Sequence, residues 1–221
     1  SHSSYYQLND TFKDLWKIKA NAFTRSYEDP MEEKEVAEFY EKKAAIFAEF
    51  GKVICISVAR FTSAGEDLKL KIKSFADHDE KKLLEEFASM LHKRFSRDEH
   101  RICGHNIKEF DIPFICRRLL VNGLAIPVYL DFQNMKPWET NTIDTFQYWR
   151  FGDYKNYTSL KLLAAALGVP SPKDDIDGSM VGHVYWNENN LERIATYCQK
   201  DVVTVANIIL RFKHLPLLNE E

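Results

Sequence analysis

The sequence predicts an α/β fold with a mixed β-sheet flanked by helices. Two neighbouring runs, 52–61 and 68–75, are rich in apolar and β-branched residues, and two shorter runs of this kind lie at 101–104 and 141–145. Patterns of apolar residues spaced by threes and fours, which indicate helices, separate and follow these runs. Strands and helices that alternate along one chain are typical of α/β proteins.

The first quarter of the chain is expected to be helical. The spacing of apolar residues predicts one helix over 8–25 and a second over 29–51. The run at 52–61 is mostly apolar, which predicts a largely buried strand, and 68–75 alternates apolar and basic residues like a strand with one wet face. Because 63–67 has the composition of a hairpin turn, we expect these two strands to pair antiparallel.

The middle of the chain alternates between helix and strand. A helix that ends at Phe95 is expected to use Asp77 or Asp79 as its N-cap. A short strand at 101–104 and a helix over 112–121 should follow.

The next segment is predicted to hold one more strand and a capped helix. Residues 124–132 contain a proline and are expected to be irregular or an edge strand, whereas 141–145 should form a brief strand. Thr158 or Ser159 can then cap a helix over 160–168. A stretch rich in Asp, Pro, Ser and Gly at 171–184 predicts a loop.

The last predicted helix, 190–212, carries an apolar stripe and two polar residues beside it. Tyr197 and Asp201 are four residues apart, so the phenol and the carboxylate should lie on one helical face. A solvated Asp and a half-buried Tyr are the ordinary interpretation of this pair. The stripe consists of Leu191, Ala195, Cys198, Val202, Val205, Ile209 and Phe212.

Composition limits the classes of function. The chain has 221 residues, 45% of them hydrophobic, which suits one globular domain. A net charge of -3 is unlike that of a protein that coats nucleic acid, although a nuclease can bind its substrate through metal ions and a local basic rim. Four cysteines without a Cys-x-x-Cys pair fit a reduced, cytoplasmic setting. No apolar run approaches the about 18 residues of a membrane span, so no membrane partner is expected.

Two stretches carry a combination of residues that suits metal-dependent chemistry. The first is Gly104-His105-Asn106-Ile107-Lys108-Glu109-Phe110-Asp111, after a short strand, and the second is Tyr197-Cys198-Gln199-Lys200-Asp201 on the last helix. They resemble the motifs of the DnaQ-like 3'-5' exonucleases of the DEDDy type. The second motif of that superfamily, Asn-x-x-x-Phe/Tyr-Asp, and the third, Tyr-x-x-x-Asp, match these stretches in order and setting.

The tyrosine variant is indicated because Thr196 stands where the sister DEDDh type has its histidine. Within the superfamily, the chain looks most like the bacterial predicted exonucleases related to the proofreading domain of family B DNA polymerases. The run at 142–145, the helix over 160–167 and the triplet at 177–179 agree with that group, and the likeness begins at Gly51. It implies a ribonuclease H-like fold with a mixed sheet flanked by helices.

The resemblance also implies a two-metal phosphodiesterase that removes nucleotides from the 3' end of a single strand, DNA being favoured over RNA. Asp111, Tyr197 and Asp201 would be catalytic, and Asp111 and Asp201 would bind metal. Carboxylate oxygens suit the hard ions Mg²⁺ and Mn²⁺, and two such ions can stabilise both the attacking and the leaving oxygen. The hydroxyl of Tyr197, a weak base with a pKa of about 10, would orient the attacking water.

Residues around these motifs have structural alternatives. Asp111 could instead cap the helix that follows it, and Asn106 could close a turn through its side chain. His105 is best explained as a packing residue. Asp144 could support the site from behind the metal ligands or cap a loop, and Phe110 would pack beneath the metal carboxylate.

Three neighbouring residues are also assigned to substrate. Asn106, Lys108 and Phe110 lie in the second motif and are predicted to contact nucleic acid. Further basic and aromatic candidates, each of which could equally be solvated surface, are Arg150, Phe151, Tyr154, Lys155, Tyr157, Lys161 and Lys200.

The first motif of the superfamily, Asp-x-Glu on a central first strand, has no match in residues 1–221. In this fold that strand lies between the hairpin and the strand at 101–104, and its loss would leave two sheet edges unpaired. A truncated chain, a strand swapped in from another copy and a natural loss each account for the absence. We expect truncation, because Asp111, Tyr197 and Asp201 are all present. Weak metal binding and little hydrolysis are expected of the chain as it stands.

We therefore expect a single exonuclease-like domain over 1–221, with 1–50 a helical insertion after the missing strand and 51–216 the exonuclease core. One alternative is a catalytically inactive nucleic-acid-binding module on the same fold. Another is a structural domain that binds no nucleic acid, which would have a closed surface and no carboxylate-lined cleft.

Overall fold

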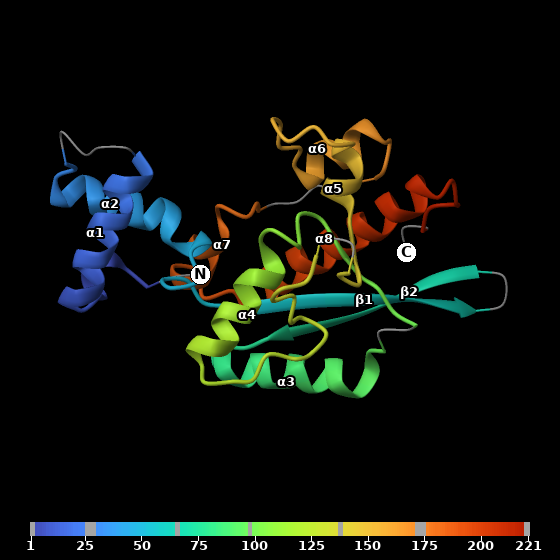
Figure 1. Cartoon of the computed structure of the whole chain (residues 1–221), viewed down its shortest axis with the longest axis horizontal. Coiled ribbons are helices and arrows are strands. Elements are labelled where there is room, and N and C mark those ends of the chain that lie inside the picture. The colour runs from blue at the N-terminus through green and yellow to red at the C-terminus, as the bar shows by residue number, and fades with distance from the viewer. Residues whose placement is uncertain are drawn as a thin grey trace.

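Figure 1 shows a computed structural model of the chain, and the residues it describes are 3–24, 30–64, 67–96, 99–136, 139–170 and 176–218. Among them the fold is α/β, with helices around short strands. Two 3₁₀ turns, η1 (Tyr5–Gln7) and η2 (Ala44–Ile46), flank the first helices. The helices and strands are α1 (Asp10–Thr24), α2 (Glu33–Lys43), β1 (Cys55–Ala64), β2 (Asp67–Ala76), α3 (Glu80–Arg94), β3 (Ile102–Gly104), α4 (Asp111–Val121), β4 (Thr142–Asp144), α5 (Thr145–Arg150), α6 (Leu160–Ala166), α7 (Val181–Trp186) and α8 (Leu191–Phe212).

The mixed sheet is present as two two-stranded pieces. β1 and β2 pair antiparallel over their whole length, from Cys55 opposite Ala76 to Ala64 opposite Asp67. β3 and β4 pair in parallel, and Gly104 lies opposite Asp144. Within the described residues, β1 and β3 therefore each have one edge without a partner strand.

The two sheet pieces are held together by shared layers. α8 packs against β1 and β2 and also against β3, so one helix covers both pieces (Figure 1). On the other face, α3 and α4 enclose a common apolar core in which Phe75, Leu84 and Leu119 are buried. Both sheet pieces thus contribute to one core, because Ile56 and Val58 of β1 and Ile102 of β3 pack against it.

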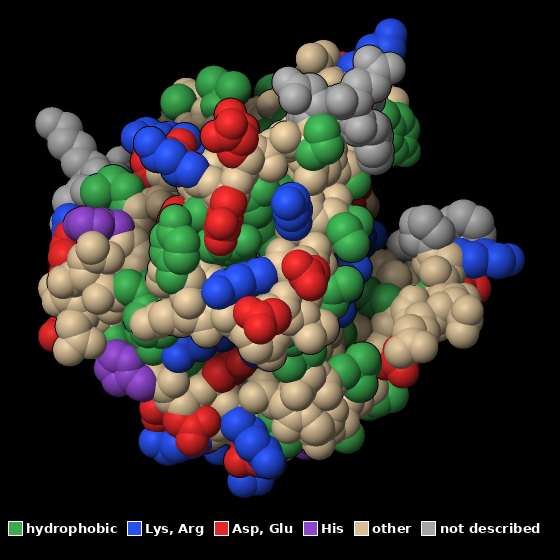
Figure 2. All heavy atoms as spheres, turned by 90° about the vertical axis from the view of Figure 1, so that its left-hand side faces the viewer, with side chains coloured by type: hydrophobic (Ala, Val, Ile, Leu, Met, Phe, Trp, Pro, Cys, Tyr) green, Lys and Arg blue, Asp and Glu red, His purple; other side chains and the backbone are tan. Residues whose placement is uncertain are grey.

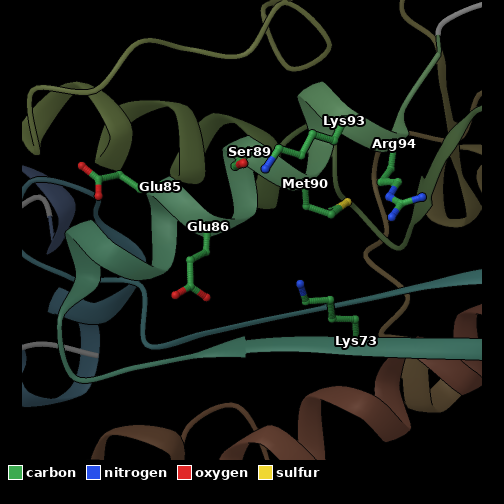
Figure 3. Close-up of a pocket in the computed structure, with 7 residues that line it drawn as sticks. All are labelled: Lys73, Glu85, Glu86, Ser89, Met90, Lys93 and Arg94. Carbon is green, nitrogen blue, oxygen red and sulfur yellow. The ribbon is translucent and has the colours of Figure 1, made fainter.

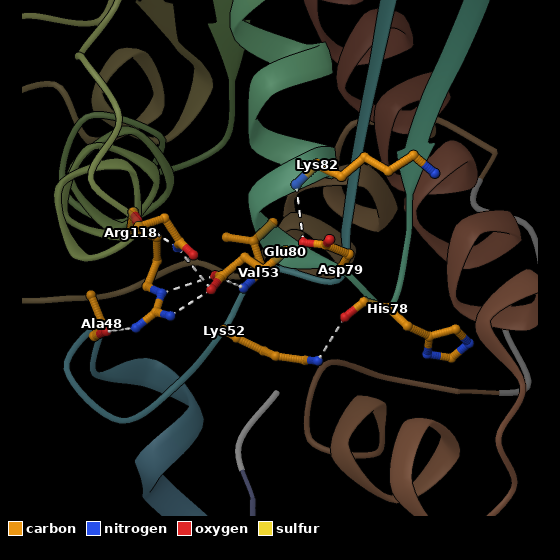
Figure 4. Close-up of polar contacts among 9 residues, drawn as sticks. Ala48, Lys52, Val53, His78, Asp79, Glu80, Lys82 and Arg118 are labelled. Atoms are coloured by element: carbon orange, nitrogen blue, oxygen red, sulfur yellow. Dashed lines mark hydrogen bonds and ion pairs between the residues drawn. The ribbon is translucent and has the colours of Figure 1, made fainter.

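A buried ion pair fixes α4, the helix that begins at Asp111, to its surroundings (Figure 4). Arg118 donates from Nε to Glu80 at 2.9 Å and from Nη1 to the carbonyl of Ala48 at 2.8 Å. Burial alone would raise the pKa of the Glu80 carboxyl. The hydrogen bonds from Arg118, Asn122 and the Val53 amide outweigh that effect and lower this pKa.

Helices α1 and α2 form a separate apolar cluster at one end of the molecule (Figure 1). Trp16 and Tyr40 are fully buried there, with their ring centroids 5.0 Å apart in an edge-to-face arrangement. Seen from this end, the surface mixes apolar side chains with charges of both signs (Figure 2). Such a surface is unlike the uniformly basic face that would bind a phosphate backbone.

Most of the expected elements are present. Of the two residues predicted to cap α3, Asp79 is the cap, and it accepts from the Lys82 amide at 3.1 Å. α8, for which no cap was predicted, is capped by Asn190, which accepts from the Arg193 amide at 3.0 Å. Ser159 caps α6 through the Leu162 amide.

The structure corrects the bounds of one predicted helix and adds two helices. The second helix begins at Glu33 rather than at the Asp-Pro pair and gives way to η2 after Lys43. The helices α5 and α7 were not predicted, and α7 occupies part of the predicted loop over 171–184. The hairpin turn at residues 65–66 and the loop at 171–175 lie outside the described residues.

No helix in the described ranges combines the length and the apolar character needed to cross a membrane.

Candidate active site

The turn between β3 and α4 is built on the carboxylate of Asp144. This side chain is buried at the end of β4 and accepts from the backbone amide of Asn106 at 2.8 Å and of Lys108 at 3.1 Å. It also accepts from the amides of Phe146, at 3.0 Å, and Gln147, at 3.4 Å, and so caps α5. Asp144 therefore caps the helix α5 rather than a loop, and it also holds the backbone of the turn that precedes Asp111.

Asn106 occupies the tightest position of that turn. Its φ is +60°, a left-handed conformation that asparagine adopts more readily than most residues. Its side-chain Oδ1 is buried and accepts no hydrogen bond. The expectation that this side chain closes the turn as an acceptor is thus wrong, because Asp144 does so through the backbone.

Asp111 is the first residue of α4, one position earlier than the predicted start of this helix. The N-cap is Phe110, which makes no side-chain capping bond, so Asp111 is not the cap. The Asp111 side chain reaches solvent, yet the protein around it desolvates the carboxyl and raises its pKa to about 6. A bond from its own amide lowers this pKa, whereas the charges of Asp144 and Asp201 raise it.

The charge of Asp201 raises the pKa of Asp111, which indicates that the two motifs lie near each other in the fold. Asp201 lies on α8 and Asp111 on α4, ninety positions apart in the sequence, and their carboxylates repel each other in the fold. Tyr197 lies one turn before Asp201 and packs, half-buried, against an apolar cluster that contains Ile194.

Cys198, next to Tyr197, anchors α8 to the hairpin. A hydrogen bond with Cys55 of β1, followed by burial, raises the pKa of the Cys198 thiol. This cysteine is therefore a neutral thiol near pH 7 and contributes packing between α8 and β1, not nucleophilic chemistry.

The buried face of α8 differs from the stripe predicted for it. Ile209 of the predicted stripe is buried as expected, and Ile194, Ala206 and Ile208, which lie outside the stripe, are buried too. The stripe residues Ala195, Cys198, Val202 and Val205 are only half-buried. The predicted stripe is apolar but incompletely covered, on the helix that spans the two sheet pieces.

Phe110 and Lys108 lie on the surface of the turn. The Phe110 side chain is 41% exposed and its ring lies 5.8 Å from that of Phe114. The expectation that Phe110 packs beneath the carboxylate in the core is therefore wrong. Lys108 is half-buried, and its amide is one of those bound by Asp144.

His105 packs as expected and also links two segments through hydrogen bonds. Its Nε2 donates to the carbonyl of Thr158 at 2.8 Å, and its Nδ1 lies 2.9 Å from the Thr145 hydroxyl. Burial lowers the pKa of His105, which favours a neutral ring. This imidazole ties the segment before α6 to the end of β3.

Tyr157 and Arg150 lie near the site, although the sequence indicates them only among further candidates for contact with nucleic acid. Tyr157 has its pKa raised by burial and then by the charges of Asp111 and Asp144, so its phenol lies close to the carboxylates. Arg150 pairs with Glu109 of the motif turn at 3.0 Å. Neither belongs to a motif, and the only sequence signal is a local excess of aromatic and basic residues at 148–161.

Asp111 and Asp201 are suitable ligands for a hard divalent ion, because a cation would relieve the repulsion and desolvation that raise the Asp111 pKa. Within the described residues, no group of three or more His, Cys, Asp or Glu side chains is placed to hold a metal ion. In the described part of the chain, Asp111 and Asp201 therefore do not belong to a larger carboxylate cluster.

A groove of about 510 Å³ lies elsewhere on the described part of the chain (Figure 3). It runs between β2 and α3 and is lined by Lys73, Glu85, Glu86, Ser89, Met90, Lys93 and Arg94. None of the motif residues lines it. The convergence of carboxylates at α4 and α8 identifies the candidate active site better than the size of this groove.

Comparison with known proteins agrees with the motifs. A sequence model of one family, described as "Predicted 3'-5' exonuclease related to the exonuclease domain of PolB", matches residues 46–217. No curated protein and no solved structure shows a significant match. The matched region includes the hairpin, Asp111, Asp144 and the whole of α8. The chain belongs to the family of predicted 3'-5' exonucleases related to the exonuclease domain of PolB.

Proposed function

We propose that this protein is a metal-dependent exonuclease that hydrolyses phosphodiester bonds from the 3' end of single-stranded nucleic acid, with DNA as the favoured substrate. The observation that supports the proposal is the electrostatic interaction between Asp111 and Asp201, which come from two distant motifs on α4 and α8. Together with the family, this supports a nuclease rather than a general α/β domain.

Each motif residue has a separate task. Asp111 and Asp201 would hold Mg²⁺ or Mn²⁺, which when bound stabilises charge on the attacking and leaving oxygens. Tyr197, one helical turn from Asp201, orients the water for in-line attack. Asp144 positions the turn through the backbone amides of Asn106 and Lys108, and this turn presents Asn106, Lys108 and Phe110 to the substrate.

The proposal requires further carboxylates between β1 and β3. In the described part of the chain, β1 and β3 each have one edge without a partner strand, and α8 contacts both strands. A strand that carries Asp-x-Glu in this space would complete the ligand set and pair both edges. Residues 1–221 contain no such motif, so we propose that this chain alone binds metal weakly and hydrolyses its substrate slowly.

The test uses a 5'-labelled single-stranded oligonucleotide with Mn²⁺. Slow shortening from the 3' end that is lost in Asp201→Asn supports the proposal. Cleavage that is unchanged in Asp201→Asn, or that starts inside the strand, would refute it.

A catalytically inactive nucleic-acid-binding module is the second candidate, favoured by the partial ligand set. Such a module would bind a single strand through cationic side chains, with strong dependence on salt and none on Mn²⁺. Metal-assisted binding that is lost in Asp201→Ala would instead support the exonuclease.

A further inference from the structure

Between α5 and α6, exposed aromatic side chains lead away from the Asp111 site. We propose that Phe151, Tyr154 and Tyr157, called here the aromatic platform, stack on the bases of single-stranded nucleic acid. This inference rests on the proposed function and extends it by naming the surface that selects unpaired bases. Their side chains are 85%, 79% and 65% exposed.

The inner end of the platform is fixed next to the carboxylates. The Tyr157 ring lies 5.1 Å from Phe146 and 6.4 Å from His105, which is bonded to the neighbouring Thr158 carbonyl. The charges of Asp111 and Asp144 act on the Tyr157 phenol. A base stacked on Tyr157 would therefore place its nucleotide beside the proposed metal ligands.

Arg150 continues the platform outward. Its guanidinium carbon lies 5.1 Å from the Phe146 ring centroid and 3.9 Å from that of Tyr154. The ion pair with Glu109 holds this guanidinium in place, so Tyr154 is oriented although it is exposed. Rings alternating with a cation suit bases and phosphates along one strand.

Phe151 supplies an independent observation. Its φ is +45° and its ψ is +37°, a left-handed conformation that is unfavourable for phenylalanine, and Gly152 follows with φ +85°. Among the described residues the exposed ring has one ring contact, 6.3 Å to Tyr148, so packing gives little in return for this strain. An exposed aromatic residue in a strained conformation is expected where a ligand contacts it.

Unpaired nucleic acid fits this surface better than a protein partner. Lys155 and Lys161, both exposed, lie in and just after the platform segment and can meet phosphates. Stacking requires that the face of each base is free, and in a duplex the neighbouring base pairs cover these faces.

The experiment measures binding without catalysis. Fluorescence anisotropy in EDTA would give the Kd for a labelled oligothymidylate of about 12 nucleotides and for an abasic strand of equal length and charge. We expect roughly tenfold tighter binding of the oligothymidylate, because stacking contributes only when bases are present.

Two variants test individual rings. Asparagine suits the left-handed conformation, so Phe151→Asn should raise Tm by about 2–4 °C while it weakens oligothymidylate binding roughly tenfold. Tyr154→Ala should weaken binding by a similar factor, whereas Tyr154→Phe should stay within about twofold of the wild type. Tyr6→Ala is the matched control, since Tyr6 is 66% exposed on the distant helical cluster, and its Kd should not change.

Equal affinity for the abasic strand, or wild-type binding by a folded Phe151→Asn, would overturn the platform. Hydrolysis, measured separately with Mn²⁺, distinguishes the two proposals. Loss of binding in the variants without any hydrolysis would remove the exonuclease and keep the platform. Hydrolysis by the wild type together with unaltered binding in the variants would remove the platform and keep the exonuclease.

Discussion

At the scale of single residues, Asp111 is subject to opposing effects. The first turn of a helix stabilises an anion, and Asp111 is the first residue of α4. Desolvation by the surrounding protein, together with the charges of Asp144 and Asp201, nevertheless dominates and raises its pKa to about 6, although the side chain reaches solvent. This carboxylate is therefore ionised near pH 7 at a cost to the fold, a cost that a nearby cation would offset.

The neutral variant Asp111→Asn should be more stable than the wild type above the raised pKa. The folded state binds more protons than the unfolded state between the ordinary pKa of 3.8 and about 6, so wild-type stability falls as pH rises through this window. In EDTA, the Tm gain of Asp111→Asn should be larger at about pH 8 than at about pH 4. The same gain at both pH values would contradict a raised pKa.

Asp144 should contribute more to stability than an ordinary surface carboxylate. Asp144→Ala leaves the amides of Asn106 and Phe146 without their acceptor in a buried turn, which should cost about 2–4 kcal/mol in urea denaturation. Asp177→Ala is the control, because Asp177 closes an exposed turn through the Ser179 amide, and no resolvable change is expected. Equal effects of the two substitutions would show that Asp144 does not hold the turn.

At the scale of elements, the attachment of α4 depends on the Glu80–Arg118 pair. Glu80→Ala leaves a buried guanidinium unpaired and should destabilise the fold by about 3–5 kcal/mol. The double variant Glu80→Leu/Arg118→Met removes both charges and should lie closer to the wild type than Glu80→Ala does. A double variant that is as unstable as the sum of the single substitutions would indicate that the two charges act independently.

Elements with local signals could be predicted from the sequence, and those without such signals could not. α3 and α8 have apolar periodicity together with a cap residue, Asp79 and Asn190, and both were located correctly. α5 and α7 have six residues each, too few for a period to show. The cap of α5 is Asp144, whose function depends on the distant β3–α4 turn.

In the candidate site, too, the residues of local motifs could be predicted from the sequence, whereas tertiary contacts could not. Motif spacing identified Asp111, Tyr197 and Asp201, but it could not show that Phe110 is exposed or that Arg150 bridges the motif turn and Tyr154. These relations depend on tertiary contacts between segments about forty residues apart.

At the scale of the whole molecule, the separation of the sheet into two pieces connects fold and function. The free edges of β1 and β3, the half-covered face of α8 and the partial ligand set occur together in the described part of the chain. One additional strand with two carboxylates would satisfy all three features. The central claim is that Asp111 and Asp201 form half of a two-metal site which such a strand completes.

The most direct measurement compares residues 1–221 with the same chain extended by a β-strand that carries Asp-x-Glu. The rate of 3' shortening of a 5'-labelled single strand is followed with Mn²⁺, and a rise in Tm reports that the strand has paired. We predict a rate increase of at least about a hundredfold, since each group that stabilises the transition state is typically worth that factor, and its loss in Asp201→Asn. A paired strand without faster hydrolysis, or hydrolysis unchanged by Asp201→Asn, would contradict the account.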